Sequence, residues 1–99
     1  MIADIQDTGM FVLSVVTASP VNSGAVSIPA NLAGALHIQS DTDCFYRISV
    51  GAVATNSGAD SNFMAAGSMQ VRIRNGERLS VIGATSAGTL YASLFYASE

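Results

Sequence analysis

The sequence at residues 44–50 is Cys44-Phe45-Tyr46-Arg47-Ile48-Ser49-Val50. Successive side chains of a β-strand point to opposite faces, so this stretch predicts a strand with one face in a core and Phe45, Arg47 and Ser49 directed away from it. Its core set is Cys44, Tyr46, Ile48 and Val50. Residues 69–74 repeat the alternation, with Met69, Val71 and Ile73 inward and Gln70, Arg72 and Arg74 outward.

Outward from these two stretches, short apolar runs recur along the whole chain and are separated by clusters of Gly, Ser, Asn, Asp and Thr. Beyond one helical turn at residues 31–34, no stretch sustains a helical period. The runs predict about eight strands, near residues 10–17, 25–28, 35–39, 44–50, 63–65, 69–74, 78–83 and 89–97. A chain of 99 residues has room for one domain. The expected fold is therefore all-β, a small antiparallel β-sandwich spanning residues 11–99.

Asn75-Gly76 predicts a hairpin between the strands at 69–74 and 78–83. A two-residue loop would set inward residues opposite outward ones, whereas a three-residue loop over residues 74–76 sets Val71 opposite Leu79. The three-residue loop is therefore expected. It would place Gly76 at positive φ, where the absence of a Cβ removes the steric cost.

Residues 1–10 differ from the rest of the chain because Asp4 and Asp7 interrupt Ile2 and Ile5. Too few apolar residues follow one another here for a core strand. We expect an N-terminal arm that reaches a neighbouring subunit and is ordered only there, since termini without local packing are normally disordered.

Two strands are apolar on both faces. Residues 11–16 are one, and residues 89–97 are the other, with Leu90, Leu94 and Tyr96 on one face and Tyr91 and Phe95 on the other. A sandwich covers only one face of each sheet, so the second cover is expected from another chain. A small barrel or a loop of the same chain wrapped over the strand is the alternative. The predicted interface residues are Ile2, Ile5, Phe11, Leu13, Tyr91, Phe95, Arg72 and Arg74.

The two arginines in this set have two interpretations. Arg72 and Arg74 share a strand face, and Arg78 and Glu77 follow across the turn. They form either a solvated, partly ion-paired edge that discourages strand addition, or a surface that docks onto an acidic partner.

The composition disfavours several classes of partner. The chain has no Lys, only 11% charged residues and a formal net charge of −3, which disfavours both nucleic acid and acidic membrane surfaces. Cys44 is the only cysteine, so no intramolecular disulfide is expected and the thiol is predicted to be buried and reduced. The N-terminus lacks the pattern of a secretion signal, and folding in a cytoplasm is expected.

Catalytic and metal sites find little support. His37 could join Asp41 or Asp43 and a serine in a triad, but no strained Gly-x-Ser-x-Gly turn is present and alternation places His37 on the polar face. Asp41 and Asp43 could offer carboxylates to calcium, but Ser40-Asp41-Thr42-Asp43 is also typical of a turn. The sequence predicts no enzyme activity, no cofactor and no metal.

From Val26 onward the chain resembles a class of small virion structural proteins of tailed bacteriophages, of the capsid decoration (cement) type. The resembling segments are Val26-Ser27-Ile28-Pro29-Ala30-Asn31, Ala35-Leu36-His37-Ile38, Cys44-Phe45-Tyr46-Arg47-Ile48-Ser49-Val50-Gly51 with Ala54-Thr55, Met64-Ala65-Ala66-Gly67-Ser68, Gly76-Glu77-Arg78-Leu79-Ser80-Val81-Ile82 and Gly88-Thr89-Leu90-Tyr91. The resemblance implies a jelly-roll-like β-sandwich without catalytic residues, and it does not extend to residues 1–10.

We therefore expect a homo-oligomeric virion protein that binds the major capsid protein or another virion protein and stabilises the head. The alternative is a binding module associated with a tail fibre or spike that recognises a host-surface glycan or protein. Tyr46, Tyr91 and Phe45 are candidate platforms for a glycan, although the chain has no Trp.

Overall fold

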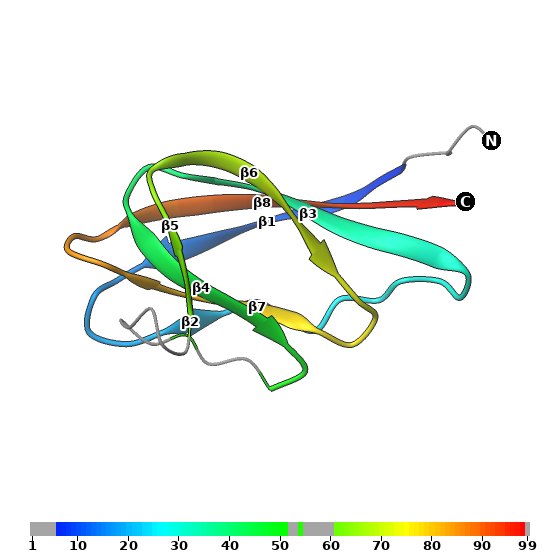
Figure 1. Cartoon of the computed structure of the whole chain (residues 1–99), viewed down its shortest axis with the longest axis horizontal. Coiled ribbons are helices and arrows are strands. Elements are labelled where there is room, and N and C mark those ends of the chain that lie inside the picture. The colour runs from blue at the N-terminus through cyan, green and yellow to red at the C-terminus, as the bar shows by residue number, and fades with distance from the viewer. Residues whose placement is uncertain (1–5, 52–53, 55–60, 99) are drawn as a thin grey trace.

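The computed structural model describes residues 6–51, 54 and 61–98, and these contain eight strands and no helix. The strands are β1 (Gln6–Val15), β2 (Val21–Asn22), β3 (Leu32–Ser40), β4 (Cys44–Ser49), β5 (Asn62–Met64), β6 (Gly67–Ile73), β7 (Arg78–Gly83) and β8 (Gly88–Ser98). Figure 1 shows them as two layers. The predicted all-β sandwich is confirmed.

The strand order is that of a jelly roll. One sheet has the order β1-β8-β3-β6 and the other β2-β7-β4-β5, and every neighbouring pair is antiparallel. The first strand pairs with the last, the second with the seventh, the third with the sixth and the fourth with the fifth. The chain is thus one long antiparallel ribbon rolled into two layers, which is the jelly-roll arrangement that the resemblance implied.

The core lies between the two sheets and is built from alternate residues of the long strands. Its fully buried members include Leu36, Ile38, Ile73, Leu79, Val81 and Leu90. Cys44 and Tyr46 point inward from β4, while Arg47 is exposed, so the predicted alternation of this strand is confirmed. Val50 is a correction: β4 ends at Ser49, and the Val50 side chain lies in the following turn and is exposed.

The expected β6–β7 hairpin is wrong, because β6 and β7 belong to different sheets. Residues 74–77 form a turn that crosses from one layer to the other, closed by a 3.0 Å hydrogen bond from the Glu77 N–H to the Arg74 carbonyl. Val71 is therefore not the ladder partner of Leu79: Val71 pairs with Leu36 in one sheet and Leu79 with Ile48 in the other. The positive φ of Gly76 is confirmed at 86°.

The segment before β3 also departs from expectation. Val26 and Ile28 are buried and Ser27 is exposed, as a strand would have them. However, residues 25–28 join no sheet, and the ladder here consists of β2, only two residues long, paired with β7. The expected helical turn at 31–34 is absent as well: Asn31 adopts a left-handed φ of 72°, and Leu32 begins β3.

The predicted N-terminal arm at residues 1–10 is wrong for residues 6–10. These residues are the first half of β1, in which Gln6 pairs with Tyr96 and Met10 with Ser93. Pairing needs only backbone groups, and β8 is eleven residues long, so β1 can follow it beyond its own apolar core residues. The domain therefore includes residues 6–10, and residues 1–5 lie outside the described part.

Candidate interaction surface

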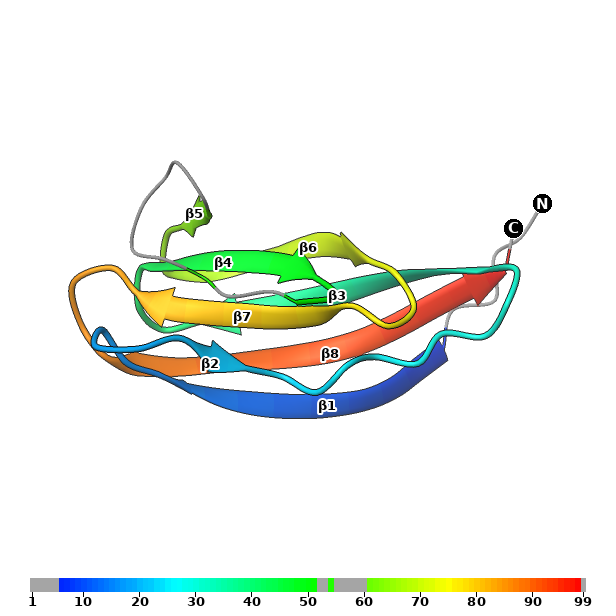
Figure 2. The same ribbon diagram turned by 90° about the horizontal axis from the view of Figure 1, so that it is seen from below.

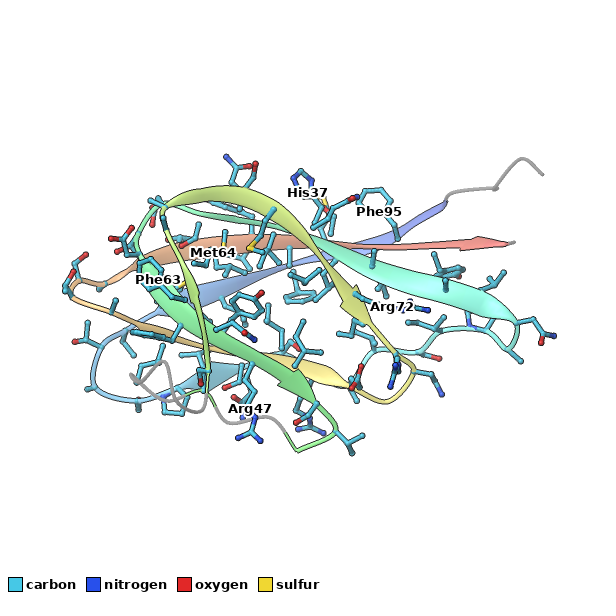
Figure 3. All side chains as sticks on the ribbon, viewed as in Figure 1. His37, Arg47, Phe63, Met64, Arg72 and Phe95 are labelled. Atoms are coloured by element: carbon cyan, nitrogen blue, oxygen red, sulfur yellow. The ribbon has the colours of Figure 1, made fainter. Side chains whose placement is uncertain are left out.

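The outer face of the β1-β8-β3-β6 sheet carries an apolar strip, defined here as Met10, Val12, Tyr91 and Phe95. Met10 is 69% exposed, Val12 55% and Tyr91 49%. The ladder places Val12 directly opposite Tyr91, and Met10 precedes Val12 by two residues on the same face, so these three side chains are neighbours. No described segment covers this face, and Figure 3 shows Phe95 and His37 directed away from the other sheet.

The six apolar residues of the predicted interface fall into three groups. Tyr91 and Phe95 lie on it. Phe11 is half-buried against the core, and Leu13 is a correction: it is 6% exposed and packs inside its own chain, so its side chain offers nothing to a partner. Its apolar character reflects the inward face of β1. Ile2 and Ile5 lie outside the described residues.

Arg72 and Arg74 are both exposed at the far edge of this sheet. In the ladder Ala35 stands between Phe95 and Arg72, so Arg72 shares the outer face with the strip. Arg74 lies in the turn after β6, where its backbone N–H donates to the Glu77 Oε1 at 2.7 Å. The Glu77 carboxylate thus stabilises the turn by accepting this hydrogen bond.

Sequence reasoning missed Met10 and Val12. Met10 falls in the predicted arm, and the predicted strand at 11–16 is apolar on both faces. Alternation separates Met10 and Val12 from Leu13 and Val15, and the pairing with β8 shows that Met10 and Val12 are on the outer face.

An open hollow of about 440 Å³ lies beside the N-terminal half of β1. Phe11, Leu94 and Tyr96 line it from the sheet, and residues 24–27 line it from the other side. The lining mixes polar and apolar surface, and its side chains include the hydroxyl groups of Ser27 and Tyr96 but no acid or base. Phe11 and Leu94 contribute apolar surface beside the edge of β1.

The outer face of the β2-β7-β4-β5 sheet differs because part of it is covered. Ser80 is fully buried there, and its Oγ accepts the Ala54 N–H at 2.8 Å. Beside it Phe45 and Phe63 pack edge to face, with 5.5 Å between ring centroids, and Phe63 is 55% exposed. Of the three candidate glycan platforms, Tyr46 is corrected, since it is buried in the core.

The polar residues that could form a catalytic or metal site either lie apart or accept hydrogen bonds from the backbone. His37 is exposed on the outer face of β3. Asp41 Oδ1 accepts the Thr89 N–H at 2.7 Å, and Asp43 Oδ1 accepts the Ala66 N–H at 2.8 Å. Both aspartates therefore connect loops. Within the described residues, no three His, Cys, Asp or Glu side chains gather closely enough to hold a metal ion.

Cys44 is a free, buried thiol, as the sequence predicted. Burial raises the pKa of this thiol, a hydrogen bond with Ser40 opposes that rise, and the negative charge of Asp43 adds to it. The thiolate is the reactive form of cysteine, so this environment makes Cys44 a poor nucleophile.

Comparison with known proteins adds no family to this geometry. No protein-family model matches the chain, and no curated protein matches it. The described residues contain no helix of sufficient length and apolarity to cross a membrane.

Proposed function

We propose that this chain is a virion structural protein of a tailed bacteriophage, a decoration or cement protein that binds the capsid surface. The observation that carries the proposal is the apolar strip on the outer face of β1 and β8. Contiguous exposed apolar surface on a soluble domain commonly marks a protein–protein contact. Jelly rolls recur in capsid and lectin domains, which supports the proposal by analogy of fold.

The proposed mechanism is adhesion without chemistry. Each copy would lay the outer face of the β1-β8-β3-β6 sheet on the major capsid protein or another virion protein. Tyr91 and Phe95 would supply the anchoring aromatic area, because such side chains dominate interface energetics. Copies would also associate with one another. Many symmetry-related copies would convert weak single contacts into avidity and stabilise the head.

Two matched substitutions test the proposal. Tyr91→Asp places a charge on the strip, whereas Phe63→Asp places the same charge on an exposed ring of the opposite sheet. Both side chains are about half exposed, so both variants should fold. Heads prepared without this protein are incubated with each variant, and bound copies are counted by gel densitometry and located by immunogold labelling. The expected result is loss of binding for Tyr91→Asp and wild-type occupancy for Phe63→Asp.

Equal binding of wild type and Tyr91→Asp to heads would contradict the proposed docking face. Absence of wild-type protein from purified heads, with label on tails instead, would contradict the capsid role itself.

The Phe45–Phe63 pair favours a second candidate, a tail fibre or spike-associated module that recognises a host-surface glycan or protein. Exposed aromatic rings at the end of a sheet can stack on sugar rings, and Phe63 is such a ring. Under this alternative Phe63→Asp would abolish binding to host cells, and Tyr91→Asp would leave it unchanged. The same two variants therefore separate the two functions.

A further inference from the structure

The four edge strands of the sandwich are unequally protected against pairing with another strand. β2 has two residues and β5 has three, so neither offers a long edge. β6 has seven residues, but Arg72 on this strand places a charge at its edge. β1 has ten residues, and the sequence from Thr8 to Val16 contains no charged residue and no Pro. Charges, Pro and short length are the devices that normally blunt an edge. β1 has one charge, Asp7, next to its register shift, and the regular stretch over residues 9–15 has no charge and no Pro.

Among the described residues, none pairs with the outer edge of β1 over residues 10–15. In the described part of the chain, residues 10–15 make their backbone pairs with β8 only, and the first contact beyond the sheet is the Val16 carbonyl, which accepts the Gly83 N–H at 2.8 Å. Figure 2 shows β1 as the outermost strand of its layer, with no described segment beyond it. A row of backbone donors and acceptors therefore faces outward next to the apolar strip.

We propose that two copies of this chain pair β1 with β1 in antiparallel orientation across a two-fold axis. The two four-stranded sheets would then form one continuous eight-stranded sheet. A two-fold axis is the natural symmetry here, because an antiparallel pair of identical strands presents the same edge to itself. This surface is an edge, distinct from the face proposed to bind the capsid, and the inference holds or fails independently of that role.

The side-chain period fixes the register of the pair. Inward residues must lie opposite inward residues, so the two-fold axis must pass through a residue and not between two residues. β1 is regular from Gly9 to Val15, after a shift between Asp7 and Gly9, and the midpoint of this stretch is Val12. The axis therefore passes through Val12, so that Val12 of one copy lies opposite Val12 of the other. Met10 then lies opposite Ser14 of the second copy, and Phe11 opposite Leu13.

The register has two favourable consequences. Met10 and Val12 of both copies join into one apolar patch on the outer face. On the inner side, the half-buried Phe11 lies at the junction, beside the hollow that it lines, so the second copy would cover an edge of the core that one copy leaves open.

The size of the contact predicts a weak dimer. Seven paired residues extend roughly 24 Å, and the two shorter extents of the sandwich are 24 and 20 Å. The edge-to-edge contact therefore buries roughly 500 Å² per copy. A standard stable complex buries about 800 Å² per partner. The dimer should form at high protein concentration, or where an assembly holds two copies side by side.

Cysteine cross-linking tests the register directly. Directly opposite side chains have Cβ atoms about 5 Å apart, within reach of a disulfide after small adjustment. Val12→Cys should give a disulfide-linked dimer under mild oxidation, and Ser14→Cys alone should not. The double variant Met10→Cys with Ser14→Cys should give the dimer again. Native Cys44 is buried and serves as the internal unreactive control.

Sedimentation velocity over a range of concentrations tests the association without cross-linking. Val12→Lys sets two positive charges opposite each other and should weaken the dimer tenfold or more. Gln70→Lys places the same exposed charge on β6, at the other edge of the sheet, and should leave association unchanged. Circular dichroism checks that each variant folds. A wild-type protein that stays monomeric at millimolar concentration would overturn the inference. So would association that survives Val12→Lys, or cross-linking by Ser14→Cys alone as efficient as by Val12→Cys.

Discussion

The side-chain oxygen of Asn75 accepts a hydrogen bond from the backbone N–H of Ile28 at 2.8 Å, although 47 positions separate the two residues. Two backbone bonds flank it: Gly76 donates to the Val26 carbonyl, and Val26 donates to the Glu77 carbonyl, each at 2.8 Å. The turn between the sheets is thereby joined to the segment that leads into β3. This contact explains why residues 26–28 are extended and buried without belonging to a sheet.

Asn75→Ala should therefore destabilise the protein, because the partly buried Ile28 N–H loses its acceptor. The expected loss is about 1–2 kcal/mol in the free energy of unfolding, measured by urea denaturation. Arg74→Ala removes an exposed side chain from the same turn and should change stability by no more than about 0.5 kcal/mol. Equal effects of the two variants would mean that the Asn75 side chain contributes nothing.

Gly76→Val tests the backbone conformation of the same turn. No atom lies within 4 Å of a Cβ at this position, so any cost must come from the φ of 86° and not from a clash. A β-branched residue in this region should cost about 1–2 kcal/mol. Gly24→Ala is the control, since that site is equally open and has no positive φ. Thermal melting of both variants gives the comparison, and an unchanged Gly76→Val melting temperature would refute the strain.

Alternation predicted most of the strands but not which strands are neighbours. The inward set of β6 and the inward set of β7 satisfy the same pattern whether the strands pair in one sheet or face each other across the core. Asn75-Gly76 fits a tight turn in either case. In the fold, Asn75 contacts Ile28 across 47 positions, and no local signal in the sequence reports a contact over that distance.

The interaction surface was predictable in part for the same reason. Tyr91 and Phe95 follow from the two apolar faces of β8, and the structure places both on the outside. Leu13 is a predicted interface residue because residues 11–16 are apolar on both faces, and its register with the buried Leu90 shows that it points inward. The start of β1 was missed because backbone pairing with β8 does not depend on the side chains of residues 6–10.

Ser80→Ala tests how the outer face of the β2-β7-β4-β5 sheet is covered. The buried Ser80 hydroxyl is the acceptor for the Ala54 N–H, so its removal leaves a buried donor without a partner. The expected loss is about 1–3 kcal/mol, together with faster hydrogen exchange at the Ala54 amide. Ser14→Ala, at an exposed position of β1, is the matched control and should leave stability nearly unchanged. Unaltered hydrogen exchange at Ala54 in Ser80→Ala would show that the Ser80 hydroxyl does not hold Ala54 against the sheet.

Cys44 should make stability fall in alkaline solution. Burial raises the pKa of its thiol above the ordinary value of 9.0 in the folded chain, whereas the unfolded thiol ionises near that value. Above about pH 9 the unfolded state therefore binds fewer protons than the folded state. The buried thiol contributes fully to the free energy of unfolding below this pH, and this contribution is lost as the pH rises toward the folded pKa. Burial also raises the pKa of Tyr46, and the charge of Cys44 adds a smaller rise, so a second loss of stability begins near pH 10.0.

Urea denaturation of wild type and Cys44→Ala from pH 7 to pH 10 should show a stability difference that is constant up to pH 8 and then moves in favour of the variant. A difference that stays constant to pH 10, or a native Cys44 that reacts with a thiol reagent as fast as in the denatured protein, would show that the thiol is not shielded from ionisation.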